Sequence, residues 1–142
     1  RRVAEVVVEI VISSRTVGML DEPAAGLDPE GREMILSQVK RYHRETGTTV
    51  VLVSHSMEDI AKYADRVLVL QAGKVAMLDT TANIFARAEE LVSYGLSVPE
   101  VTKIFLKLRE MGLDIPVDVY TVKYARDTIL NALAQRGGEG RA

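Results

Sequence analysis

The sequence contains no cysteine and only two histidines among its 142 residues. The absence of cysteine excludes disulfide bonds and thiolate metal sites. His43 and His55 are too few and too far apart in the sequence to predict a zinc site. A net charge of −2 gives no reason to expect nucleic acid or an anionic lipid as a partner.

The sequence also lacks a long hydrophobic run. The longest one, from Val6 to Ile12, is interrupted by Glu9 and is far shorter than the roughly 20 residues that a membrane span needs. No cleavage-type segment follows it, so it does not read as a signal peptide. The length is typical of one domain with an appendage. Because the chain begins at Arg1 without a methionine, we expect a fragment or a processed product.

The segment from Met19 to Pro29 is the most informative part of what is present. Asp21 and Glu22 are adjacent carboxylates at the end of an apolar stretch, and Pro23 stops that stretch. If both continue a strand, their side chains point to opposite faces, so that one can reach a Mg²⁺ ion and the other a water molecule. However, the sequence has no Gly-x-x-x-x-Gly-Lys-Ser/Thr loop to cradle phosphates. The pattern predicts half of a nucleotide site, and the alternative is a solvated acidic turn.

Strand and helix patterns alternate in the first half of the chain. The segment from Val6 to Ile12 is compatible with a strand or with a buried helix, because periodicity cannot separate the two. Further strands are expected over residues 16–20, 49–53, 66–70 and 74–78, and helices over residues 28–45 and 56–63. This order predicts an α/β domain with a mainly parallel sheet and flanking helices.

The first expected helix has clear end signals. Asp28 is a good N-cap, Pro29 suits the first helical position, and Gly47 suits the C-cap. We expect His43 on its solvated face. The expected apolar stripe consists of Ile35, Val39 and Tyr42.

From about residue 80 onwards, the pattern is entirely helical. Ser97 and Glu100 predict a capping box, and Thr121 can cap a last helix. Between them an apolar stripe has helical spacing and needs a surface to cover it, either the sheet of this chain or a partner. The stripe consists of Val101, Ile104, Phe105 and Leu108.

His55 follows an apolar strand through Ser54. Ligands bind at the carboxyl ends of strands in open parallel sheets. A histidine there can donate a hydrogen bond to a phosphate oxygen and orient water; the alternative is a polar cap of the strand end.

The order of these features resembles ATP-binding-cassette (ABC) transporter ATPases. Leu20 to Pro23 resembles the Walker B segment, Ala25 to Asp28 the D-loop, and Ser54 with His55 the switch histidine, within a match that covers about residues 16–85. The wording Ala-Ala-Gly-Leu-Asp-Pro and the helices over residues 97–133 resemble the ATPase subunits of energy-coupling factor transporters, which import vitamins and metal ions.

The resemblance implies a partial P-loop-NTPase-like fold and a role for each site residue. Asp21 would bind Mg²⁺ through water, and Glu22 would be the catalytic base. His55 would contact the γ-phosphate of ATP, and Asp28 with its loop would reach across an ATPase dimer. Residues 1–85 would be the C-terminal portion of the ATPase domain, residues 86–136 a helical extension, and residues 137–142 a disordered tail.

The resemblance also implies partners and a location. These are a second ATPase subunit, identical or different, and a membrane coupling subunit that holds the protein at the cytoplasmic face of the membrane, with no role for nucleic acid. The phosphate loop, the Gln loop and the signature motif are absent from the 142 residues, and residues 5–18 depart from the family pattern. We therefore expect this chain alone to bind neither ATP nor Mg²⁺ and to be inactive. The alternatives are a non-catalytic pairing module and a separate α/β binding domain that only echoes the motif.

Overall fold

The computed structural model describes residues 5–10, 17–116 and 118–139, which form five strands and six helices. The strands are β1 (Glu5–Ile10), β2 (Val17–Asp21), β3 (Thr49–Val53), β4 (Arg66–Gln71) and β5 (Lys74–Thr80). The helices are α1 (Pro29–Thr46), α2 (Met57–Tyr63), α3 (Thr81–Ala86), α4 (Ala88–Ser93), α5 (Glu100–Glu110) and α6 (Val122–Glu139). The expected α/β class is confirmed.

The strands form one mixed sheet in the order β2-β3-β1-β4-β5. Only β2 and β3 are parallel neighbours, and the other three adjacent pairs are antiparallel. Because β1 is antiparallel to both β3 and β4, the strands β2, β3 and β4 all run in one direction. The sheet is therefore not mainly parallel, contrary to the expectation, because β1 lies at its centre and runs antiparallel to both of its neighbours. The segment that was compatible with strand or helix is a strand as far as Ile10, and residues 11–16 lie outside the described residues.

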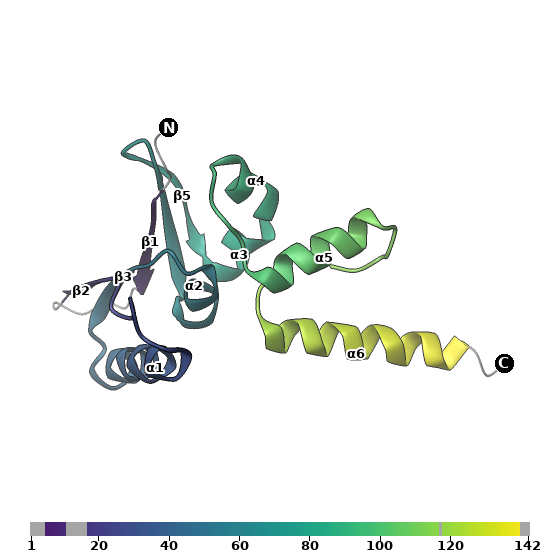
Figure 1. Ribbon diagram of the computed structural model, residues 1–142, viewed down its shortest axis with the longest axis horizontal. Helices are drawn as coiled ribbons and strands as arrows, with labels where there is room; N and C mark the ends of the chain where they lie inside the picture. The colour runs from purple at the N-terminus through teal and green to yellow at the C-terminus, as the bar shows by residue number, and fades with distance from the viewer. Residues whose placement is uncertain (1–4, 11–16, 117, 140–142) are drawn as a thin grey trace.

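The main core lies between the sheet and the helices α1 to α4. It includes Leu36 of α1, Leu52 of β3, Ile60 of α2, Val69 of β4 and Phe85 of α3, none of which is more than 2% exposed. Burying a side chain of this kind contributes about 1.5–3 kcal/mol each. This core fixes the sheet and the helices that follow its strands as one body (Figure 1).

The helices α5 and α6 project from one side of that body (Figure 1). They share a smaller buried cluster formed by Phe105, Val119 and Ala125. The expected apolar stripe of the first of these helices is therefore only partly covered, because Phe105 is buried while Ile104 is 55% exposed. We call α5, α6 and the loop between them the extension.

The helix signals at residue 97 and beyond residue 136 need correction. Pro99 occupies the N-cap position of α5, and the Ser97 hydroxyl donates to the Val98 carbonyl, so the expected capping box does not form. At α6 the expected cap is confirmed, since the amide of Tyr124 donates to the Thr121 hydroxyl. This helix continues to residue 139, through the glycines expected to begin a disordered tail, and residues 140–142 lie outside the described residues.

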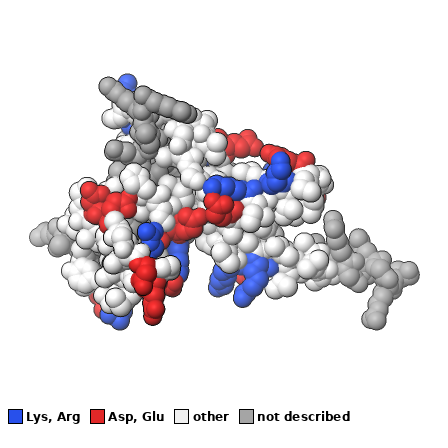
Figure 2. Space-filling view, in the orientation of Figure 1, with Lys and Arg blue, Asp and Glu red and all other residues white. Residues whose placement is uncertain are grey.

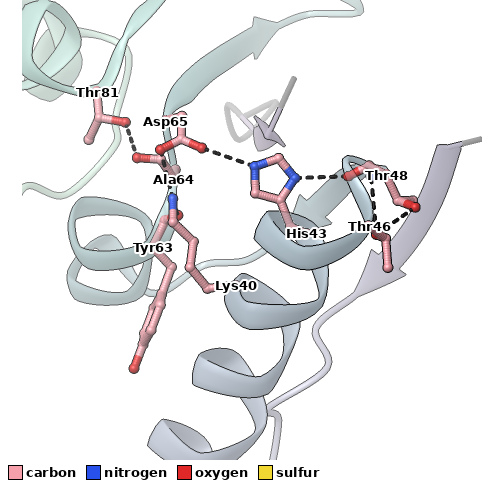
Figure 3. A network of polar contacts seen from close by, with 8 residues as sticks. All are labelled: Lys40, His43, Thr46, Thr48, Tyr63, Ala64, Asp65 and Thr81. Carbon is pink, nitrogen blue, oxygen red and sulfur yellow. Dashed lines mark hydrogen bonds and ion pairs between the residues drawn. The ribbon is translucent and has the colours of Figure 1, made fainter. Parts of the chain in front are cut away.

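His43 is buried, and the expectation of a solvated position is wrong (Figure 3). Its Nδ1 lies 2.8 Å from the Thr48 carbonyl oxygen, which can only accept, so Nδ1 donates. Its Nε2 lies 3.6 Å from Oδ2 of Asp65, whose Oδ1 accepts from Lys40 at 2.7 Å. These contacts attach the end of α1 to the starts of β3 and β4.

The buried face of α1 differs from the expected stripe. Leu36 and His43 are the buried residues of this helix, whereas Tyr42 is 53% exposed and Ile35 and Val39 are only partly buried. The face is rotated by about one residue because the imidazole finds polar partners inside the protein.

The surface carries interspersed charges of both signs (Figure 2). Several of them form ion pairs, such as Lys62 with Glu33 and Lys107 with Glu110. Among the described helices, none combines the length and hydropathy that a membrane crossing requires.

Candidate functional site

The ends of β2 and β3 lie side by side at one edge of the sheet. The two strands are parallel, and Asp21 pairs with Val53 at their last residues. The amide of Glu22 extends this pairing by donating to the Val53 carbonyl at 2.9 Å. The residues that follow the two strands are therefore brought together at this edge of the sheet.

Glu22 leaves the strand conformation. Its φ is +44°, in the left-handed region that residues other than glycine seldom adopt, at a cost of roughly 1–3 kcal/mol. Its carbonyl accepts from the amide of Ala25 at 3.0 Å, which closes a turn. The condition under which Asp21 and Glu22 would point to opposite faces is not met, because the strand ends at Asp21.

The Glu22 carboxylate is held by the segment after β3. Its Oε1 accepts from the backbone amide of His55 at 2.7 Å, and the His55 Nε2 lies 3.7 Å from the same oxygen. The His55 side chain is 75% exposed, whereas that of Glu22 is 34% exposed. The backbone amide therefore fixes the carboxylate, while the imidazole remains accessible to a ligand from solvent.

Asp21 lies exposed at the end of β2. Within the described parts of the chain, no three histidine, aspartate or glutamate side chains gather in a set that could hold a metal ion. The Asp21 carboxylate could thus serve as one oxygen ligand of a Mg²⁺ ion, with water and other molecules supplying the remaining ligands.

Asp28 does not join the Glu22–His55 pair but caps α1. Its Oδ1 accepts from the amide of Gly31 at 2.8 Å, as the N-cap signal predicted. A Cβ at Gly31 would lie 2.8 Å from that oxygen, so only glycine fits here without a shift. The loop between Glu22 and Asp28 contains Gly26 with φ +75°.

The sequence did not predict the hydrogen bonds that two serines make at this edge. Ser54 is buried, and its hydroxyl accepts from the amide of Ser56 at 3.1 Å. The Ser56 hydroxyl accepts from the amide of Asp59 at 3.2 Å and caps α2. The spacing Ser-x-Ser before a helix was the available signal, since both are local side chain-to-backbone bonds.

An ion pair between α1 and α2 was also missed. The Arg32 guanidinium donates to Asp59 Oδ2 at 2.8 Å, and the Asp59 side chain is only 12% exposed. It links the two helices that begin after the loops of the candidate site. No local sequence signal could reveal it, because the partners are 27 positions apart.

The sequence is similar to ATP-binding subunits of energy-coupling factor transporters. It is 54% identical over 123 residues to the energy-coupling factor transporter ATP-binding protein EcfA2 of Symbiobacterium thermophilum, a match over 87% of this chain and 42% of that protein. The protein of the same name from Clostridium perfringens is 42% identical over 133 residues, or 94% of this chain and 46% of that protein. The protein of the same name from Halalkalibacterium halodurans is 41% identical over 141 residues, or 98% of this chain and 49% of that protein. The chain thus spans about half the length of the curated relatives it matches.

Among solved structures, the chain is similar to cbiO1 from Clostridium perfringens, described as part of the ABC transporter complex cbiONQ. The identity is 30%, the TM-score is 0.47, and the match covers 68% of this chain and 35% of that one. No family model matches the chain. Its similarity to the curated relatives, over the part of them that it spans, places the chain in the family of energy-coupling factor transporter ATP-binding proteins.

Proposed function

We propose that this chain is the part of a transporter ATPase subunit that supplies the Walker B carboxylates and the switch histidine. The observation that carries the proposal is the Glu22 carboxylate, held at 2.7 Å by the His55 amide at the adjoining ends of two parallel strands. Strand ends of this kind are where ligands of α/β sheets bind.

Each residue has a distinct role in the proposed reaction. Glu22 accepts a proton from the water that attacks the terminal phosphate, and the exposed His55 imidazole donates to a phosphate oxygen. Asp21 holds Mg²⁺ through water, an ion that neutralises phosphate charge when it is bound. Asp28 shapes the loop that faces a second ATPase subunit, since its cap fixes where α1 begins.

The chain is proposed to act only within a larger assembly. It has no phosphate-binding loop, the element that supplies most of the contacts to the β- and γ-phosphates. We propose that it works with a second ATPase subunit and a membrane coupling subunit at the inner face of the cell membrane. There, ATP hydrolysis would drive the import of a metal ion or a vitamin.

A chimera tests this proposal. The corresponding part of the Clostridium perfringens relative is replaced by this chain, and Mg²⁺-dependent ATP hydrolysis of the chimera is measured. We expect Glu22→Gln to reduce turnover about a hundredfold or more, since loss of a general base has effects of that order. Glu30→Gln, at an exposed carboxylate of α1, is the matched control and should keep turnover within twofold. Equal turnover of the two variants would overturn the assigned role of Glu22.

The isolated chain provides the complementary measurement. We expect no Mg²⁺-dependent ATP hydrolysis from it. Turnover that Glu22→Gln abolishes would contradict the proposal that the chain acts only within a larger assembly.

A second candidate function is a non-catalytic pairing module, which the extension favours. A groove of about 400 Å³ lies between α5 and α6. Its lining includes Ile104, Ile129 and Leu130, which are 55%, 46% and 56% exposed. Contiguous apolar surface of this kind marks an interaction site, and the proposed cover is a second copy of the chain or a full ATPase subunit. A monomer in sedimentation at high concentration would count against pairing, and a dimer that Leu130→Glu dissociates would support it.

A further inference from the structure

Helix α5 begins without a cap from its own sequence. Pro99 at the N-cap position has no side-chain acceptor, so the first amides of the helix need partners from elsewhere. The amide of Glu100 donates instead to Oε1 of Glu58, a residue of α2, at 3.2 Å. The negative charge of a carboxylate at this position also interacts favourably with the positive end of the helix dipole.

The start of α2 is in turn attached to the candidate site. Glu58 is three residues beyond His55, whose amide donates to the Glu22 carboxylate. The Ser56 hydroxyl caps α2 by accepting from Asp59. Along the chain, only the N-cap Ser56 and the first helical residue Met57 separate His55 from Glu58.

The extension makes further contacts at the same place. The ring of Tyr120 stacks on Phe85 of the body, with 5.6 Å between ring centroids. Within the extension, the buried Thr102 hydroxyl donates to the Val119 carbonyl at 2.8 Å. A cavity of about 330 Å³ lies between α2 and the starts of α5 and α6. Around Glu58 the body and the extension therefore meet at the Glu58–Glu100 hydrogen bond and at the Tyr120–Phe85 ring stack, with the cavity beside them.

We propose that Glu58 is a positioning residue that couples the segment carrying His55 to the extension. When the His55 segment moves relative to Glu22, α2 carries Glu58 with it and the cap of α5 changes. Conversely, a displacement of the extension alters how α2 presents His55. This proposal rests on the proposed function and deepens it, because it connects the extension to the edge of the sheet that carries Asp21, Glu22 and His55.

The test uses the full chain without nucleotide and two amide signals in nuclear magnetic resonance spectra. Glu58→Ala is expected to accelerate hydrogen exchange of the Glu100 amide about fivefold, as loss of a helix cap does. It is also expected to shift the amide resonance of His55, whose amide donates to Glu22 and not to Glu58. Glu58→Gln keeps an oxygen acceptor, so the exchange rate of the Glu100 amide and the resonance of the His55 amide should stay close to those of the unmodified chain. Glu30→Ala removes a first-turn carboxylate of α1 and should change neither signal.

The reciprocal variant tests the coupling from the other end. Glu22→Ala removes the acceptor of the His55 amide and should change the exchange rate of the Glu100 amide, because coupling acts in both directions. If Glu58→Ala leaves His55 unshifted and Glu22→Ala leaves Glu100 unchanged, the contact is only structural and the coupling is overturned. Unchanged Glu100 exchange in Glu58→Ala would overturn the contact itself. Since neither measurement involves ATP, a failed chimera assay would leave this result standing, and the reverse also holds.

Discussion

At the scale of single residues, two non-glycine positions in the described parts of the chain have positive φ. Glu22 has φ +44°, and Ala72, in the turn between β4 and β5, has φ +52°. The carboxylate of Glu22 accepts from the His55 amide in that conformation, so the strain accompanies a specific contact. Ala72 has only a methyl group, and its turn with Gly73 at φ +76° is the two-residue hairpin turn that favours glycine or asparagine.

We predict that Ala72→Gly stabilises the protein. Glycine removes the penalty of the left-handed conformation, and the free energy of unfolding should rise by about 0.5–1 kcal/mol. Urea unfolding followed by circular dichroism measures this change. The control is Gln38→Gly against Gln38→Ala, in the middle of α1, where glycine should lower stability by about 1 kcal/mol. A loss of stability in Ala72→Gly would contradict the turn geometry.

Asp79 gives a prediction on pH dependence. Hydrogen bonds from the Asn83 side chain and the Thr80 amide lower the pKa of the Asp79 carboxyl below its ordinary value of 3.8. Because the pKa is lower in the folded state, ionised Asp79 favours folding above about pH 4, and this contribution is lost as the pH falls through the folded pKa. Asp79→Asn keeps an oxygen acceptor but cannot ionise.

The free energy of unfolding of Asp79→Asn should therefore fall less steeply between about pH 4 and pH 2 than that of the unmodified chain. Urea unfolding at a series of pH values measures both slopes. Identical slopes for Asp79→Asn and the unmodified chain would show that these hydrogen bonds do not favour the ionised carboxyl.

At the scale of secondary-structure elements, α1 is attached to the sheet through a polar contact inside the protein. The His43 ring is 2% exposed and donates to the Thr48 carbonyl, beyond the end of the helix (Figure 3). Lys40, one turn earlier, donates to the Tyr63 carbonyl at 2.9 Å. These bonds connect α1 with the segments before β3 and before β4.

We predict that His43→Leu destabilises the protein by about 2 kcal/mol, because the Thr48 carbonyl would be left buried without its donor. Leucine fills a similar volume, so the decrease in the free energy of unfolding would come mainly from the lost hydrogen bond and not from a cavity. Tyr42→Leu, at the exposed neighbouring position, should change stability by less than about 0.5 kcal/mol. Equal stability of the two variants would argue against a structural role for the His43 contact.

At the scale of the whole molecule, the body and the extension have separate buried clusters. The body holds the large cluster around Leu52 and Ile60, against which Leu106 and Tyr120 of the extension pack, whereas the extension's own cluster is formed by Phe105, Val119 and Ala125. A smaller cluster supports less stability, so the extension is expected to open locally more often than the sheet.

Phe105→Ala tests this division. Removing the ring should accelerate hydrogen exchange throughout α5 and α6 by at least tenfold, since such truncations cost about 3–5 kcal/mol. The amides of β3 should keep their protection. Ile104→Ala, at a 55% exposed position of the same helix, is the control and should have a small effect. A uniform acceleration across β3 and α6 would indicate one cooperative unit.

Much of the fold and of the site could be predicted from local patterns. The ends of β2 and β3, and therefore the positions of Asp21, Glu22 and His55, follow from apolar runs that stop at polar residues. The Asp28 cap depends on a residue three positions away. Such signals act within one turn or one strand, so a sequence reading captures them.

The parts that could not be predicted depend on distant partners. The Glu22–His55 bond joins residues 33 positions apart, and the Glu58–Glu100 bond joins residues 42 positions apart. The left-handed conformation of Glu22 accompanies the first of these contacts. The burial of His43 likewise needs Asp65, which a helical pattern does not reveal.

By itself, the sequence determined the α/β class, the ends of the strands and the family, because apolar periodicity, capping residues and the Asp-Glu and Ser-His pairs are local properties. Only the tertiary structure decided the central, antiparallel place of β1, the hydrogen bond from the His55 amide to the Glu22 carboxylate, and the capping of α5 by Glu58. A strand pattern carries no direction, and a backbone amide is the same at every non-proline residue. Which groups meet is therefore fixed only when the packing of the core brings the elements together.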